Sequence, residues 1–313
     1  ITAEDVAQIV SLKTGIPLEK FSEDESTKLL NMEKELKVQI VGQDDAVSKI
    51  SKCIRRNRVG LKNPNKPGGV FLFLGSTGTG KTFTVKTLAK YLFGTEDSMI
   101  RIDMSEYGEK HNVSRLIGSP PGYVGYGEGG QLTEKVRRKP YCIILLDEIE
   151  KAHPDVLNIL LQVFDDGKLT DGQGRVVNFK NTIIVMTSNI GSKELKNSKG
   201  PGPSLGFGTS AVQSTKTDMA KSEHAKKIIK NALAERLAPE FINRIDDIII
   251  FASLAKDNIY RIIDLEIKTV ASKLKDMGYT LTITDNVKDF LIENGYDEEM
   301  GARPMKKQKK YCL

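Results

Sequence analysis

Gly75-Ser76-Thr77-Gly78-Thr79-Gly80-Lys81-Thr82 is the stretch that decides the fold of this chain. It follows the apolar run 70–74 and opens a segment, 82–93, that has a helical pattern. A glycine-rich loop between a strand and a helix can wrap its N–H groups around phosphate oxygens, with a lysine for the outer phosphates and a hydroxyl for Mg²⁺. An ordinary glycine-rich turn is the alternative. The pattern favours a nucleotide-binding P-loop, with its ligands among Thr77, Gly78, Thr79, Gly80, Lys81 and Thr82.

A pair of acids follows the apolar run 143–146. Asp147 could hold Mg²⁺ through water, because it ends a strand that looks buried and parallel, and Glu148 could polarise a water against the γ-phosphate. The alternative is a helix cap followed by a first-turn acid. Together with the P-loop, the pair indicates hydrolysis rather than binding alone.

Apolar runs recur beyond the P-loop, separated by helical patterns, at 99–104, 143–146, 182–186 and 248–251. Alternating strands and helices predict an α/β fold with a doubly wound parallel sheet, whose ligands bind at the carboxyl ends of the strands. The P-loop, Asp147 and Asn189 all fall at such ends. Asn189 could help to position the attacking water, or it could simply cap a turn.

The helical and apolar patterns divide the chain into three parts. We expect bracing helices in 1–38, near 2–13 and 25–36, and a large nucleotide-binding domain in 39–251 that opens with a helix through 46–54. From residue 253 the pattern changes to a helix, a short strand at 281–283 and a helix near 290–292, which predicts a small, mainly helical domain in 252–313. The stretch 193–221 is of low complexity.

Composition favours an intracellular protein. The 313 residues are 39% hydrophobic, and the three cysteines, Cys53, Cys142 and Cys312, are too few and scattered for a disulfide framework or a zinc site. No apolar run is long enough to span a bilayer, and the first residues lack a signal-peptide pattern. We therefore expect a cytoplasmic protein, or one inside an organelle, with no membrane partner. The net charge of +6 comes mostly from four lysines near the end of the chain, so it does not indicate nucleic acid.

Further motifs lie in order along the chain: LIGSPPGYVGY at 116–126, LDEIEKAHP at 146–154, DGQGR at 171–175, PEFINRID at 239–246 and GARP at 301–304. Together with the P-loop they closely resemble the second ATPase module of the Clp AAA+ protein unfoldases, most like the ClpC type. The resemblance covers essentially the whole chain. It implies an AAA+ P-loop ATPase that uses ATP and Mg²⁺ and works as a homo-hexameric ring.

The resemblance also implies roles for single residues. Lys81 and Thr82 match the Walker A residues, Asp147 and Glu148 the Walker B pair, and Asn189 the sensor of the γ-phosphate. Arg244 matches the arginine finger that reaches the neighbouring subunit, Arg303 the second sensor, and Val41 and Gly42 the segment that frames the adenine. A cation near the γ-phosphate is what phosphoryl transfer requires. Without the surrounding family motifs, Arg244 and Arg303 would be interpreted as solvated or ion-paired surface residues.

Two further segments bear on the substrate and on a partner. Tyr123, with Val124 beside it and glycines around both, resembles the pore loop that grips unfolded or tagged polypeptides, although a tyrosine could also pack beneath its own loop. Leu205, Gly206 and Phe207 resemble the loop by which protease-associated Clp ATPases dock on a serine peptidase ring. The alternative is a loop that folds back on its own domain. We therefore favour delivery to a peptidase over a ClpB-type disaggregase.

Two other classes of protein are weighed against this resemblance. A nucleic-acid motor should carry basic residues in its translocating loop, yet 118–130 has none. A scaffold that only binds nucleotide would lack Glu148.

The sequence departs from the family pattern at several positions. Lys13 stands where the family has Trp, and Ser76 where Pro is common. Because parts of the family's small domain and its earlier domains have no counterpart, we expect the chain to be a fragment of a two-ring ATPase.

Overall fold

The structure, a computed structural model, describes residues 2, 5, 6, 9, 25–59, 63–119, 121, 122, 129–190, 228, 229, 231–279, 281, 287 and 288. Its longer elements are α2 (Glu25–Gln39), α3 (Asp44–Arg58), β1 (Gly69–Leu74), α4 (Lys81–Phe93), β2 (Met99–Asp103), α5 (Val113–Ile117), α6 (Gln131–Arg138), β3 (Ile143–Asp147), α7 (Pro154–Asp166), β4 (Lys168–Thr170), β5 (Val176–Asn178), β6 (Ile183–Ser188), α10 (Pro239–Asn243), β7 (Asp247–Ile250) and α11 (Lys256–Asp276). Short 3-10 helices include η3 (Met104–Tyr107) and η5 (Ile149–Lys151).

Five parallel strands form the central sheet, in the order β2-β3-β6-β1-β7. Every residue of β1 and β6 is buried, as expected for parallel strands that are covered on both faces. The register sets Leu74 opposite Ser188 and Asp103 opposite Asp147, so these strands end at one edge of the sheet. The predicted parallel, doubly wound architecture is confirmed.

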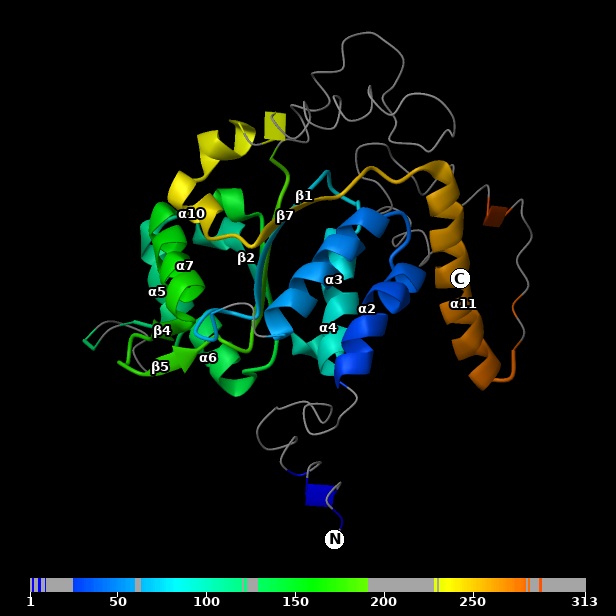
Figure 1. The fold of residues 1–313 in the computed structure, drawn as a ribbon, viewed down its shortest axis with the longest axis horizontal. Helices are drawn as coiled ribbons and strands as arrows, with labels where there is room; N and C mark the ends of the chain where they lie inside the picture. The colour runs from blue at the N-terminus through cyan, green and yellow to red at the C-terminus, as the bar shows by residue number, and fades with distance from the viewer. Residues whose placement is uncertain are drawn as a thin grey trace.

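Helices pack on both faces of this sheet (Figure 1). Because side chains alternate along a strand, Val70, Leu72 and Leu74 of β1 enter the core shared with α5, α6 and α7. Phe71 and Phe73 enter the core shared with α2, α3 and α4. The two cores hold the sheet between the helical layers and fix the edge at which its polar residues gather.

A short antiparallel hairpin, β4 and β5, follows α7 and was not predicted from the sequence. Helix α7 has Pro154 in its first turn and ends before Gly167, whose φ of 59° lies in the left-handed region that favours glycine. This end turns the chain directly into β4. Strands of three residues carry too little alternation to be recognised in a sequence.

Several of the predicted helices are present at the expected positions. Helices α2, α3 and α4 match the predicted segments at 25–36, 46–54 and 82–93, and α11 follows the predicted change of pattern. The predicted strand at 281–283, the helix near 290–292 and the stretch 193–221 lie outside the described residues, apart from position 281. The division of the chain at 38 and 252 stays a prediction. Among the described residues, no helix has the length and apolarity needed to cross a bilayer.

Candidate functional site

The P-loop joins β1 to α4 at the polar edge of the sheet. Gly75, Gly78 and Gly80 have φ angles of 154°, 79° and 95°, which glycine adopts without strain. Helix α4 begins without a side-chain cap and without an acidic residue in its first turn. Its first N–H groups and the positive end of its dipole are therefore available to an anion, as the predicted phosphate site requires.

Lys81 links this loop to its own backbone and to Asn189, the residue that follows β6. Its Nζ donates to the carbonyls of Gly75 and Ser76 at 2.6 and 2.9 Å, and to Oδ1 of Asn189 at 3.1 Å. Burial lowers the pKa of Lys81 from 10.5 to about 8, against the attraction of Asp147, Glu150 and Glu148. The structure thus brings together the predicted Walker A lysine, the Walker B acids and the sensor asparagine.

Thr187, on β6, links the two predicted Walker B acids. Its hydroxyl donates to Oδ1 of Asp147 and accepts the backbone N–H of Glu148 at 3.3 Å. Glu148 has a φ of 54°, the only left-handed non-glycine residue in the part of the chain that the structure describes. Because Thr187 is buried, this bridge fixes the turn that carries Glu148 out of β3.

The other oxygen of Asp147 is held from the edge strand. Arg101 of β2 donates to Oδ2 through Nε at 3.0 Å and through Nη2 at 2.6 Å. Beside it, Glu150 accepts the backbone N–H of Asn189 at 3.3 Å, which ties η5 to the end of β6. The Asp147 carboxylate and the backbone N–H groups of Glu148 and Asn189 are therefore each held by a contact from a neighbouring segment.

Val41 and Gly42, the predicted adenine-framing residues, lie between the P-loop side of the large domain and α11. Val41 is buried, and Gly42 has a φ of 75°. A Cβ on Gly42 would lie 2.6 Å from Nδ2 of Asn258 and 3.2 Å from a methyl of Leu254. Gly42 therefore lets the segment approach α11 closely.

Arg244, the predicted arginine finger, is ion-paired within its own chain. Its Nε lies 2.6 and 2.7 Å from the two carboxylate oxygens of Asp165, and its Nη2 lies 3.6 Å from Glu240. The guanidinium side chain is one-third exposed. Asp165 therefore holds Nε, while one terminal nitrogen, Nη2, lies near Glu240.

Known proteins resemble this chain in sequence and fold. A family model described as the AAA domain (Cdc48 subfamily) matches residues 66–248, a span that holds the P-loop, both acids, Asn189 and Arg244. The chain belongs to this family. A second model, described as the C-terminal, D2-small domain of ClpB protein, matches residues 254–308 of this AAA chain.

Curated relatives carry Clp names. The AAA chain is 52% identical over 309 residues to a protein named ATP-dependent Clp protease ATP-binding subunit ClpA homolog from Guillardia theta, covering 98% of this chain and 37% of that protein. It is 51% identical over 305 residues to ATP-dependent Clp protease ATP-binding subunit ClpC from Staphylococcus aureus, covering 97% and 36%. The chain therefore spans little more than a third of the length of these relatives.

Solved structures of Hsp104 share the fold. An Hsp104-ADP complex from S. cerevisiae aligns with a TM-score of 0.82 at 40% identity, covering 99% of this chain and 51% of that one. A closed-state reconstruction titled Hsp104:ATPyS and FITC casein aligns with a TM-score of 0.79 at the same identity and coverage. The predicted AAA+ fold, the kinship with Clp ATPases and the assignment as a nucleotide-binding ATPase module are confirmed. The roles of single residues stay predictions.

The foot of the predicted substrate loop is built with little free space. Ile117 and Gly130, at the two ends of the loop, are in close contact. A Cβ on Gly130 would lie 2.3 Å from the carbonyl carbon of Ile117. Thr133 Oγ1 also lies 3.5 Å from the Ile117 carbonyl oxygen and 3.4 Å from that of Gly130. The hairpin turn contributes the N–H of Gly172, which donates to the same Ile117 oxygen at 2.9 Å.

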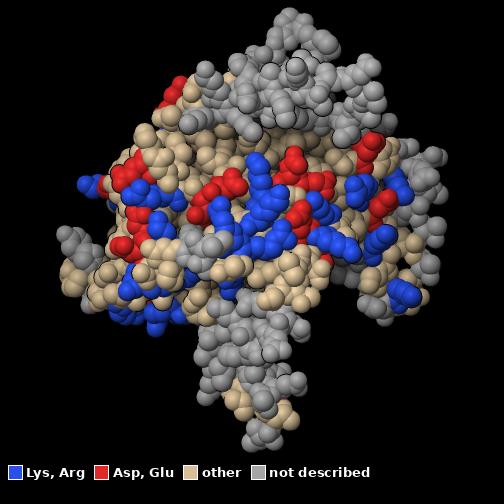
Figure 2. Space-filling view, in the orientation of Figure 1, with Lys and Arg blue, Asp and Glu red and all other residues tan. Residues whose placement is uncertain are grey.

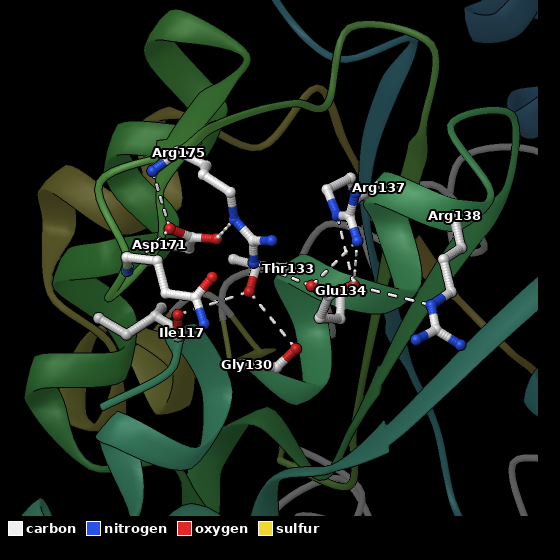
Figure 3. Close-up of polar contacts among 9 residues, drawn as sticks. Ile117, Gly130, Thr133, Glu134, Arg137, Arg138, Asp171 and Arg175 are labelled. Atoms are coloured by element: carbon white, nitrogen blue, oxygen red, sulfur yellow. Dashed lines mark hydrogen bonds and ion pairs between the residues drawn. The ribbon is translucent and has the colours of Figure 1, made fainter. Parts of the chain in front are cut away.

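Charged side chains join this loop foot to the hairpin. In Figure 3, Glu134 of α6 lies between Arg175 on one side and Arg137 and Arg138 on the other. Arg175 donates to Glu134 at 2.8 Å and to the buried Asp171 at 2.7 Å. Arg137 and Arg175 hold the pKa of Glu134 below its usual range. The DGQGR motif is therefore structural at this point, because it anchors the hairpin to α6.

Some predicted site residues lie outside the described residues: Tyr123, Val124, Arg303, Leu205, Gly206 and Phe207. Three further residues, Arg101, Thr187 and Gln43, were not predicted from the sequence, because their contacts cross between strands or between distant segments. Thr187 and Gln43 sit beside predicted residues in the sequence, two before Asn189 and next to Gly42. Their type alone gave no signal of their contacts.

Proposed function

We propose that the chain is the ATP-hydrolysing motor module of a ring-forming protein unfoldase, which threads polypeptide through a central pore. One arrangement supports this most directly. At a single sheet edge, Lys81 contacts Asn189 while Thr187 holds Asp147 and the turn of Glu148. Two acids, a lysine and a sensor asparagine that are linked in this way suit phosphoryl transfer better than nucleotide binding without hydrolysis.

In this proposal Thr82 and Asp147 hold Mg²⁺. The donor set fits, because a hydroxyl and a carboxylate oxygen are hard ligands of the kind that Mg²⁺ prefers, with water completing its shell. Asp147 keeps acceptor capacity beyond its contacts with Arg101 and Thr187, since a carboxylate offers about four lone-pair sites. When bound, Mg²⁺ would neutralise charge on the β- and γ-phosphates.

The proposed hydrolytic roles follow from position. Lys81 exchanges its contacts with two loop carbonyls for the outer phosphates, which offer it full negative charge. Glu148 orients and polarises the attacking water, and Asn189, which already contacts Lys81, positions that water from β6. The N–H groups of the P-loop hold the remaining phosphate oxygens.

A ring would complete the site. We propose that Arg244 reaches the γ-phosphate in the neighbouring subunit, with Nε anchored on Asp165 and Nη2 exchanging its 3.6 Å contact with Glu240 for a phosphate oxygen. Arg303 would contribute a second cation from the small domain of the same subunit. Val41 and Gly42 would frame the adenine beside the P-loop.

Substrate grip and delivery complete the proposal. Tyr123, with Val124, would press on polypeptide from a loop whose foot is closely packed, so that movement of α6 is passed to the loop. Leu205, Gly206 and Phe207 would dock on a serine peptidase ring, in line with the Clp protease names of the relatives. A disaggregase without a peptidase is the second candidate, favoured by the fold shared with Hsp104.

Two variants of the full-length protein separate these roles. Tyr123→Ala should leave basal ATP turnover intact and stop the unfolding of a stable tagged protein, and undiminished unfolding would remove Tyr123 from the mechanism. Replacing Leu205 and Phe207 with Ser should preserve unfolding but abolish peptidase-coupled degradation. Unchanged degradation would remove Leu205 and Phe207 from peptidase docking, whereas absence of coupled degradation in the wild type would favour the disaggregase.

The charge distribution bears on the nucleic-acid alternative. Figure 2 shows Lys and Arg in a band over α2, α3 and α4, with Asp and Glu on both sides of it. Part of this band is neutralised, since Glu33 pairs with both Lys37 and Arg55. A mixed face of this kind is typical of a solvated surface rather than of a phosphate-binding groove.

The deciding experiment compares two stimulators of ATP turnover in the full-length protein. An unfolded protein such as casein should raise the rate of phosphate release, whereas single-stranded DNA should leave it unchanged. Stimulation by DNA alone would overturn the proposal in favour of a nucleic-acid motor. Absence of turnover with both, while ATP still binds, would indicate a nucleotide-dependent scaffold.

A further inference from the structure

Gln43 occupies a buried position between two segments that are far apart in the sequence. It immediately precedes α3 and is 4% exposed. Its Nε2 donates to the carbonyl of Thr79 in the P-loop at 3.1 Å and to the carbonyl of Ala252 at 2.9 Å. Its Oε1 accepts the N–H of Ala252 at 3.1 Å. One side chain thus joins the phosphate loop to the stretch between β7 and α11.

The chemistry of these partners fixes the orientation of the amide. Two carbonyls face its NH₂ group and one N–H faces its oxygen, so the flipped amide would set like groups against each other. The three contacts satisfy a polar group that is removed from water, which makes each of them costly to break.

The same junction is closely packed through backbone. A Cβ on Gly75, the first residue of the P-loop, would lie 2.8 Å from the carbonyl oxygen of Phe251. The N–H of Phe251 donates to Leu74 at 2.7 Å. On the other side, Gly42 meets Asn258 and Leu254. The P-loop therefore has little room to change shape without moving the chain at 251–254.

We propose that Gln43 is the residue that couples occupancy of the P-loop to the connection between β7 and α11, and so to the position of the small domain. Rearrangement of the loop around phosphate shifts the Thr79 carbonyl. Gln43 passes this shift to Ala252, because the same Nε2 serves both carbonyls. Gln43 is thus a positioning residue that leaves phosphate contact to the P-loop itself. This inference rests on the proposed nucleotide site.

The test is hydrogen exchange on the full-length protein, with and without ADP and Mg²⁺. In the wild type, ADP should slow exchange in a peptide covering the P-loop and should also change it in a peptide covering Ala252, whose N–H Gln43 holds directly. Gln43→Met removes all three contacts, and Gln43→Glu keeps only the acceptor for Ala252. In both variants the P-loop should still respond to ADP, while the response at Ala252 is lost.

A matched control is Asn57→Asp in α3, which removes the amide contacts with the Gly68 carbonyl at 3.0 Å and with Cys53 Sγ at 3.8 Å without touching the junction. It should keep both responses. Basal exchange at Ala252 should rise about three- to tenfold in Gln43→Met, as expected for loss of a hydrogen bond. In that variant thermal melting reports whether the fold is intact.

The outcomes are distinguishable. A wild type whose P-loop responds to ADP while Ala252 does not would overturn the coupling, whatever the variants do. A response at Ala252 that survives in Gln43→Glu or Gln43→Met would overturn the role of Gln43. If ADP affects neither peptide in the wild type, the proposed nucleotide site fails instead.

Discussion

The Arg101 guanidinium lies against the carboxylate of Asp147, with Nη2 and Nε 2.6 and 3.0 Å from the same oxygen. The Arg101 guanidinium thus contacts one oxygen, Oδ2, of the Asp147 carboxylate that we propose as a Mg²⁺ ligand. Arg101 is about half exposed, at 53%, whereas Asp147 is at 14%. The pair therefore contributes modestly to stability, but it competes with any metal that approaches Asp147.

Arg101→Met should lower the Mg²⁺ concentration needed for nucleotide binding. The expected change is about two- to fivefold, the range set by an exposed ion pair worth up to about 1 kcal/mol. Binding of a fluorescent ADP analogue across a Mg²⁺ series measures it. Arg137→Met is the matched control, because Arg137 forms an ion pair of similar exposure with Glu134 elsewhere. A raised Mg²⁺ requirement would mean that Arg101 positions Asp147 for the metal rather than competing.

Lys81 should give the protein a distinctive dependence of stability on pH. Its pKa is about 8 in the folded chain and 10.5 ordinarily, so between these values the unfolded state binds more protons. Raising the pH through this window therefore favours folding. The stability of the wild type relative to Lys81→Met should rise from about pH 8 to 10.5 and stay level below about pH 7. Urea unfolding at a series of pH values tests this, and a flat or falling difference would contradict it.

The foot of the predicted substrate loop should not tolerate a methyl group. Gly130 has an ordinary φ of −82°, so alanine there is acceptable to the backbone, but its Cβ would overlap Ile117. Gly130→Ala should cost about 1–3 kcal/mol of unfolding free energy, as overpacking does. Gly108→Ala is the control, since its nearest contact would be 3.3 Å. Equal stabilities of the two variants in urea would show that Gly130 and Ile117 are packed less closely than in this structure.

The role that we propose for Arg244 as an arginine finger is testable by mixing subunits. Arg244→Ala should abolish turnover while ATP still binds, because the proposed finger would serve the neighbour's site. Mixing this variant with Glu148→Gln should restore some phosphate release, since some interfaces then pair an intact finger with an intact acid. Absence of recovery across a range of mixing ratios would count against a shared site.

The chemistry at the sheet edge could be predicted because it follows from the order of elements. Parallel strands must end together, so Lys81, Asp147 and Asn189 could be expected to meet before any contact was known. Arg101 and Thr187 could not, since their roles depend on strand register and on the length of each side chain. Neither quantity is visible as a sequence pattern.

Long-range contacts set the other limit. The contacts of Gln43 with Ala252 join residues 209 positions apart, and a glutamine before a helix is unremarkable in a sequence. Gly130 likewise reads as one glycine among several in its loop, although only its contact with Ile117 makes it necessary. Folding decides such contacts through close packing, which composition and periodicity do not record.

The central claim is that the acid pair at the end of β3 hydrolyses ATP. Its most direct test is phosphate release by Glu148→Gln, beside ATP affinity and with the exposed Glu109→Gln as control. We predict that Glu148→Gln lowers turnover by about 100-fold or more while ATP affinity changes little, as expected for loss of a general base. Turnover near that of the wild type, in a variant that binds ATP normally, would contradict the account.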